Sequence, residues 1–167
     1  SSVLDLGEGT VRSLLDILKS NDLLTSNKEG HFLNKKGQEI TNKIKDKINM
    51  EQVELKDTLQ NRKNIAVHIK HIKNKNIGKA YELRDIALKN GADGALILEY
   101  DKGLKLYGLE DSDNDVHFQE IEHKFELRLG DIVVITYAAS YKLAEHGVLA
   151  VVIEICDGIK NTIEKLK

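Results

Sequence analysis

The chain of 167 residues contains no proline and no tryptophan, a single cysteine, and four arginines beside 21 lysines. The lone cysteine, Cys156, excludes an internal disulfide and a zinc site built from several cysteines. No apolar run reaches the ~20 residues of a membrane span, and the first residues lack the basic start and apolar core of a signal peptide. We therefore expect a cytoplasmic protein with no membrane partner.

The charges are unevenly distributed along a chain whose net charge is only −2. Residues 1–47 hold 8 basic against 7 acidic side chains, residues 51–75 hold 6 against 3, and residues 99–126 hold 3 against 9. A positive first half that lies apart from an acidic segment can present one end of a protein to phosphates. A solvated lysine-rich face gives the same pattern, so charge alone does not decide between the two.

An apolar stripe predicts a helix over residues 8–20. Its members follow the i, i+3, i+4, i+7 spacing of one helical face: Val11, Leu14, Leu15 and Leu18. Before this helix, the apolar residues of segment 3–6 predict the end of a shorter helix, and Gly7 permits a sharp turn between the two. Helix, tight turn and helix form the helix-turn-helix arrangement.

A hairpin and a further helix are predicted next. Two short apolar runs, 23–25 and 31–33, flank a polar loop that ends in Gly30, which indicates a β-hairpin. Asn34 can cap a helix from Lys35 to Ile48. The apolar stripe of that helix recurs every fourth residue, at Ile40, Ile44 and Ile48.

From residue 65 the pattern changes to that of an α+β domain. Alternating apolar residues predict a strand that begins at Ile65. Helices are expected at 78–90, 140–155 and 159–166, and strands at 95–100, 104–107 and 132–137. The expected organisation is a first domain over 1–50, a connector over 51–64 with a short strand at 52–55, and a second domain over 65–167.

The string LGEGTVRSLLDILKSNDLL at 6–24, followed by the hairpin and by FLNKKGQE at 32–39, resembles winged-helix transcriptional regulators. The first helix of that family and most of its second have no counterpart here, so we expect residues to be missing before Ser1. The resemblance implies an α+β fold in which a partial winged helix precedes an α+β sandwich domain. It also implies double-stranded DNA as the partner.

In such a domain, residues 8–20 would be the recognition helix. The apolar stripe would hold this helix in place, with Leu14, Leu15 and Leu18 buried, and leave a polar face for DNA. Arg12 can pair with guanine, while the other polar side chains can contact bases or phosphates. The candidate DNA-binding residues are Thr10, Arg12, Ser13 and Lys19 on the helix, with Lys28 and His31 on the hairpin. The alternatives are a protein-interaction adaptor on the same scaffold, or a small-molecule-binding protein with a vestigial wing.

The second domain resembles an uncharacterised archaeal family of winged-helix regulators with an α+β C-terminal domain. The matching residues are Arg84, the segments NGADGA at 90–95 and GDIVVI at 130–135, and Glu145. Small residues at 138–139 lead a strand into a helix whose amides attract anions. We therefore expect a small anionic or polar effector near Arg84, Ser140 and Glu145. A tight strand–helix corner, with small residues present only for packing, is the alternative.

The histidines and the sequence motifs give no sign of a metal site or a catalytic site. His68 and His71 are three residues apart on a predicted strand, so they point to opposite faces and do not share a metal. We expect the histidines to be dispersed on the surface, and the chain to have no metal, no cofactor and no catalytic activity, since no known catalytic fingerprint is present.

The expected assembly is a homodimer, because winged-helix proteins commonly read two-fold DNA sites. The Ile40, Ile44 and Ile48 stripe and the helix over 141–155 offer the apolar surface for it.

Overall fold

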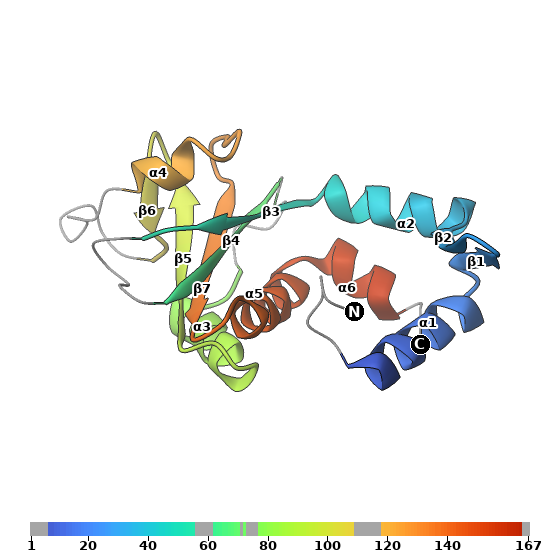
Figure 1. Ribbon diagram of the computed structural model, residues 1–167. Coiled ribbons are helices and arrows are strands. Elements are labelled where there is room, and N and C mark those ends of the chain that lie inside the picture. The colour runs from blue at the N-terminus through green and yellow to red at the C-terminus, as the bar shows by residue number, and fades with distance from the viewer. Residues whose placement is uncertain (1–6, 56–61, 71, 73–76, 109–117, 165–167) are drawn as a thin grey trace. The chain divides into compact units, whose positions relative to one another are not determined.

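The computed structural model describes residues 7–55, 62–70, 72, 77–108 and 118–164 (Figure 1). The chain forms two compact units. Unit 1 comprises Ser1–Asp46 with Thr162–Lys167, and unit 2 comprises Lys47–Asn161. No helix of the described ranges combines the length and the apolar character needed to cross a bilayer.

Unit 1 contains two helices joined by a hairpin: α1 (Glu8–Ser20), β1 (Leu24–Asn27), β2 (Gly30–Leu33) and α2 (Lys35–Lys45). Asn34 has the predicted capping role, because its side chain accepts a 2.9 Å hydrogen bond from the Gly37 amide. Its Nδ2 also donates to the carbonyl oxygen of Asp22 at 2.8 Å, which fastens α2 to the end of α1. Gly37 is buried, and a Cβ there would collide with the carbonyl oxygen of Leu23. Only glycine therefore fits where α2 crosses this backbone.

Unit 2 is built on a five-stranded antiparallel sheet in the order β3-β4-β7-β5-β6. The strands are β3 (Ile48–Val53), β4 (Lys63–Ile69), β5 (Gly94–Tyr100), β6 (Leu104–Leu106) and β7 (Ile132–Ala138). From Asn64 to Ile69 every residue of β4 is buried, as are six of the seven residues of β7. These central strands are covered on both faces, which explains their continuous apolar character.

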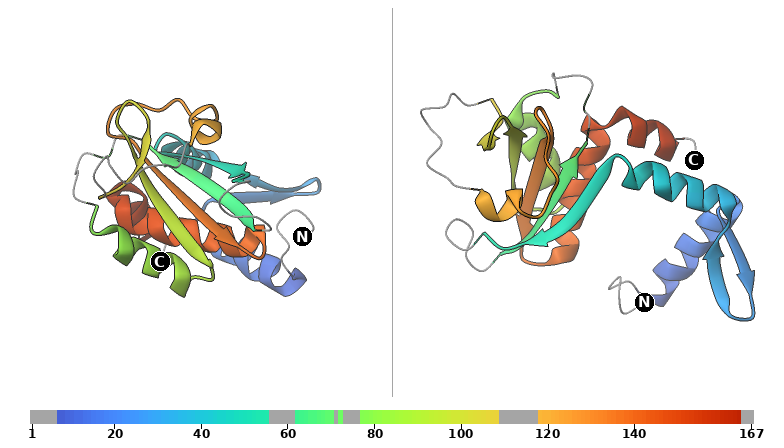
Figure 2. Two further views of the ribbon diagram at one scale, coloured as in Figure 1. Left: turned by 90° about the vertical axis from the view of Figure 1, so that its left-hand side faces the viewer. Right: turned by 90° about the horizontal axis from the view of Figure 1, so that it is seen from above.

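Helices cover the two faces of this sheet unequally. α3 (Ala80–Lys89) and α5 (Tyr141–Ile155) pack on one face, and α4 (Gln119–Glu122) lies over the other (Figure 2). On the α4 face, Phe118, Ile121 and Phe125 join a core with Val133 and Ile135 of β7. The last helix, α6 (Asp157–Glu164), follows α5. The α+β fold expected from the sequence is confirmed.

Two sequence predictions are corrected in this region, and one element is found that was not predicted. Ile48 does not belong to α2, which ends at Lys45, but begins β3. The predicted connector, 51–64, is strand at both of its ends, because β3 ends at Val53 and β4 begins at Lys63. The sequence of β3 is polar because β3 is an edge strand, with a neighbour on one side only. The short helix α4 was not predicted, since four residues give no periodic signal.

Candidate functional site

The polar residues expected to read DNA lie on the surface of unit 1. Thr10, Arg12, Ser13 and Lys19 are all exposed on α1. The guanidinium of Arg12 lies 3.3 Å from the carboxylate of Glu8 one turn earlier, and 74% of the Arg12 side chain is accessible. The hydroxyl of Ser13 donates to the carbonyl oxygen of Gly9 at 3.1 Å. The exposed candidates on α1 thus comprise two hydroxyls and two cations, of which Arg12 has an exposed carboxylate partner.

The two hairpin candidates are exposed at the β1–β2 turn. Lys28 belongs to the two-residue loop between Asn27 and Gly30, which are paired across the strands. The side-chain oxygen of Asn27 accepts hydrogen bonds from the amides of Glu29 and Gly30, at 2.8 and 3.2 Å, and so fixes the turn. His31 Nδ1 lies 2.7 Å from the hydroxyl of Ser26 on the opposite strand. The hairpin is confirmed, with a tighter loop than the sequence indicated.

The apolar face of α1 is less covered than predicted. Leu14 is 39% exposed, Leu15 and Leu18 are half-buried, and no residue of α1 is fully buried. The prediction that all three leucines are buried was therefore wrong. The described elements of unit 1 cover only part of the stripe, because the hairpin packs near the end of the helix, where Leu23 is buried.

The proposed effector residues lie on two different helices of unit 2, Arg84 on α3 and the other two at the start of α5. Arg84 of α3 is half-exposed, is 3.4 Å from Asp85, and lines a cavity of about 630 Å³ between the start of α3, β5 and the segment after β6. Ser140 caps α5 by accepting from the Leu143 amide at 3.3 Å, and Glu145 is half-buried one turn later. Neither lines the Arg84 cavity. An effector bound by all three residues stays a prediction.

A buried histidine–aspartate pair in unit 2 was missed by the sequence analysis. His68 of β4 and Asp131, just before β7, have side chains only 2% and 5% exposed. His68 Nε2 lies 2.7 Å from Asp131 Oδ2, which also accepts a 2.9 Å hydrogen bond from the Arg128 amide. The His68 ring packs against Phe125, with ring centroids 5.6 Å apart. The pair thus ties the loop before β7 to the middle of the sheet.

The expectation of dispersed surface histidines is corrected by this pair. His123 and His146 are exposed, as expected, while His71 and His117 lie outside the described residues. The sequence analysis expects His68 on the surface, but β4 is a central strand and both of its faces are covered. The sequence feature that could have indicated a buried pair is Asp131, a carboxylate directly before the largely apolar strand β7, because a buried carboxylate needs a partner. Within the described ranges, no group of three or more histidine, cysteine or carboxylate residues is arranged to hold a metal.

The fold defines a two-unit α+β protein: a helix–hairpin–helix unit and a five-stranded antiparallel sheet with helices on both faces. Residues 60–155 match the family described as "Domain of unknown function (DUF4443)", and the chain belongs to that family. Residues 1–39 match the family "PH0730-like, N-terminal domain".

The solved structure of "Hypothetical protein PH0730 from Pyrococcus horikoshii OT3" is similar to the whole chain. The identity is 28% and the TM-score 0.74, over 98% of this chain and 86% of that one. No curated protein matches the sequence significantly. The resemblance to an archaeal protein is therefore confirmed, whereas a regulatory role is not addressed by these matches.

Proposed function

We propose that this protein is a cytoplasmic regulator of transcription, which binds double-stranded DNA through α1 and the β1–β2 hairpin and does not act as a catalyst. The observation that supports this proposal is the exposure of all six candidate residues on unit 1. A helix of this width fits the major groove, where an arginine can form two hydrogen bonds with guanine. A hairpin beside such a helix can supply phosphate contacts that set its register.

Glu8 bears directly on how Arg12 would be used. Its carboxylate oxygen lies 3.3 Å from a guanidinium nitrogen of Arg12, and the two exposed side chains are one helical turn apart. Exposed pairs of this kind contribute little free energy, so DNA can take Glu8's place at small cost. In the complex, Glu8 would face phosphates and oppose binding. The two residues therefore predict effects of opposite sign on affinity.

The DNA test uses the full chain and a duplex selected by the protein from a random pool. Arg12→Ala should weaken binding by roughly 1–3 kcal/mol and relax the preference at one base pair. Lys28→Ala should weaken binding to every sequence alike and reduce the salt slope by about one. Fluorescence anisotropy at several salt concentrations measures both effects, because phosphate contacts release counterions.

Two further variants make this test specific. Glu8→Gln should tighten binding, because it removes a negative charge from the surface that faces DNA. Arg62→Ala removes an exposed arginine of unit 2, which pairs with Asp93 at 3.2 Å, and should leave the affinity unchanged. An affinity that does not fall with salt, or equal losses for Arg12→Ala and Arg62→Ala, would contradict DNA reading by α1.

Assembly of the regulator as a dimer is supported by a different observation, the exposed apolar side chains of unit 1. They are Leu14 and Ile17 of α1, 39% and 55% exposed, and Phe32 and Leu33 of β2, 47% and 40% exposed, of which the last two point to opposite faces of the hairpin. Large exposed apolar side chains that gather in one unit mark contact surfaces. We propose a second copy of the chain as the partner, in keeping with a regulator that reads a two-fold DNA site.

This surface replaces α5 as the proposed contact. Most apolar residues of α5 face its own sheet, where Ala144, Val148, Val151 and Val152 are buried, and only Leu143 and Leu149 of this helix are exposed large apolar residues, at 38% and 37%. Of the isoleucine stripe, Ile40 and Ile44 are half-buried on α2. The surface left for dimerisation is therefore chiefly that of α1 and β2.

Light scattering of the full chain should give the mass of a dimer. The double variant Ile17→Lys, Phe32→Lys should shift it to the monomer, because two buried ammonium groups would oppose the contact. Leu129→Lys is the matched control, since Leu129 is a 76% exposed leucine of unit 2. A monomer at every concentration, or an equal shift for the control, would remove the dimer from the proposal.

A further inference from the structure

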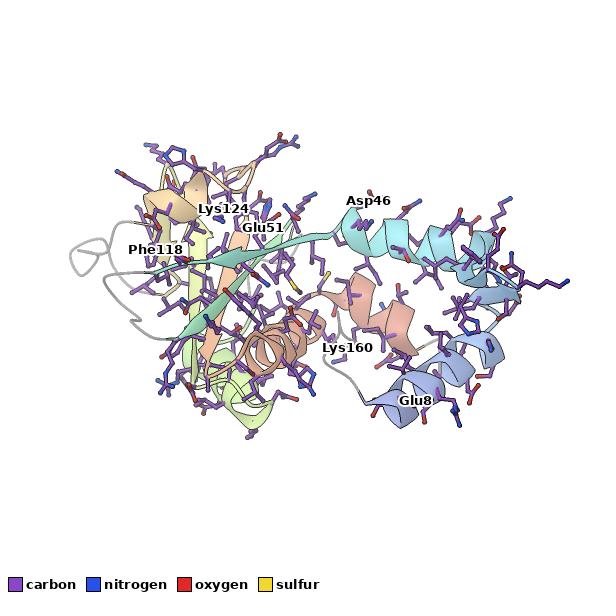
Figure 3. The ribbon with its side chains drawn as sticks, viewed as in Figure 1. Glu8, Asp46, Glu51, Phe118, Lys124 and Lys160 are labelled. Carbon is purple, nitrogen blue, oxygen red and sulfur yellow. The ribbon has the colours of Figure 1, made fainter. Side chains whose placement is uncertain are left out.

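A cavity of about 340 Å³ opens beside the buried histidine–aspartate pair of unit 2. Its walls come from β3, from the end of β4 and from the segment 124–131 that leads into β7. Figure 3 shows Lys124 just after α4 and beside β3, and its ammonium donates to the carbonyl oxygen of Gln52 at 3.0 Å. All of the lining residues belong to unit 2.

The charges around this cavity favour an anion. Lys70, Lys124 and Arg128 contribute three cationic side chains. Neither Lys70 nor Arg128 has a side-chain ion pair with any residue that the structure describes. Of the two carboxylates, Asp131 already accepts from His68 and from the Arg128 amide, and Glu126 is exposed. Three cations and two carboxylates leave a net formal charge of +1 at the cavity.

His68 adds a polar atom aimed at the same space. Because a carboxylate only accepts hydrogen bonds, the contact with Asp131 places a proton on Nε2. Nδ1 makes no hydrogen bond to the described part of the chain. In those ranges Asn64 Oδ1 is the only buried side-chain nitrogen or oxygen without a hydrogen-bond partner, so Nδ1, which has none, is not fully buried. Nδ1 therefore opens to the cavity that His68 lines. In a neutral imidazole this nitrogen accepts a hydrogen bond.

We propose that this cavity binds a small organic anion that carries a carboxylate or phosphate group together with a hydroxyl group. Arg128 and Lys70 bind the anionic group, and Nδ1 of His68 accepts from the hydroxyl, with Asp131 holding the ring in place. The cavity volume is at the lower end of the range for small-molecule sites. The site lies entirely within unit 2, so it does not depend on DNA binding by unit 1.

The test measures the thermal stability of the full chain with four compounds at equal ionic strength. Malate and glycerol 3-phosphate carry both groups, whereas succinate lacks the hydroxyl of malate, and inorganic phosphate lacks the glycerol. Ligands that bind only the folded state raise the melting temperature. We expect malate to raise the melting temperature more than succinate does, or glycerol 3-phosphate to raise it more than phosphate does. If malate gives the larger rise, the anionic group is a carboxylate, and if glycerol 3-phosphate does, it is a phosphate.

Variants on the exposed rim locate the site without disturbing the buried pair. Arg128→Gln and Lys70→Gln should each weaken binding, measured by calorimetry, by about tenfold or more, because a hydrogen bond to a charged group is lost. Arg84→Gln removes an arginine of the other cavity and should change nothing. The proposal is overturned if none of the compounds stabilises the protein at about 10 mM, which would fill a site of millimolar affinity. It is equally overturned if Arg84→Gln abolishes binding while Arg128→Gln does not.

Discussion

Replacement of Asp131 by alanine should lower the free energy of unfolding by about 3 kcal/mol, the scale expected when one member of a buried polar pair is removed. Two groups lose their acceptor at once, because Oδ2 accepts from His68 Nε2 at 2.7 Å and from the Arg128 amide at 2.9 Å. His68 is only 2% exposed, so water cannot fully replace the carboxylate. Urea denaturation of the variant and the wild type measures the change.

Asp93→Ala is the matched control for this prediction. Asp93 pairs with Arg62 at 3.2 Å, but both side chains are more than 40% exposed. Exposed ion pairs contribute about 0–1 kcal/mol, so the control should be nearly neutral. Asp131→Asn keeps an acceptor oxygen, so its loss in the free energy of unfolding should lie between those of Asp131→Ala and Asp93→Ala. Similar small losses for Asp131→Ala and Asp93→Ala would show that the buried pair does not stabilise unit 2.

Gly147→Val should destabilise unit 2 by about 3 kcal/mol, at the upper end of the usual cost of overpacking. Gly147 lies in the middle of α5, where this helix passes close to the end of α3 and the segment after it. A Cβ at this position would lie 2.6 Å from Cβ of Ala92 and 3.3 Å from the carbonyl oxygen of Ala87. Both neighbours are buried, and one of the atoms belongs to the backbone, so the clash cannot be relieved by rotating a side chain.

The same substitution at Gly158 provides the comparison within unit 2. Gly158 lies in the first turn of α6, and a Cβ there would meet only Cε of Lys47, at 3.9 Å. Valine and glycine differ by less than about 0.5 kcal/mol in helix propensity, so the free energy of unfolding of this variant should be close to that of the wild type. If Gly147→Val were as stable as Gly158→Val, α5 would not pack against Ala92 in solution.

Periodic apolar patterns predicted most of the fold. α1 spans the predicted residues, α5 runs from Tyr141 to Ile155, and β7 extends the predicted strand by one residue. The capping role of Asn34 followed from local chemistry alone. Elements without a period were predicted poorly. β3, which pairs with a single neighbour and needs no apolar alternation, was predicted only as a short strand at 52–55, and the one-turn helix α4 was missed. Local sequence carries little information about such elements, because the rest of the fold determines them.

Prediction of the sites was limited by distance along the chain. The exposure of Arg12 and Lys28 followed from helical and hairpin patterns, since both residues belong to local structure. His68 and Asp131 are 63 residues apart, and only the pairing of β4 with β7 brings them together. No sequence spacing encodes that contact. The burial of His68 depends on its strand having neighbours on both sides, which one sequence does not show.

The division of the chain has a consequence for how unit 2 can be handled. The polypeptide leaves unit 1 after Asp46 and returns to it at Thr162, so unit 2 is an insertion within unit 1. The return falls inside α6, which spans Asp157–Glu164, so the boundary after Asn161 divides a helix. A cut within a helix removes backbone hydrogen bonds, whereas a cut beyond its end does not. A separately expressed unit 2 should therefore extend from Lys47 to the end of α6 at Glu164.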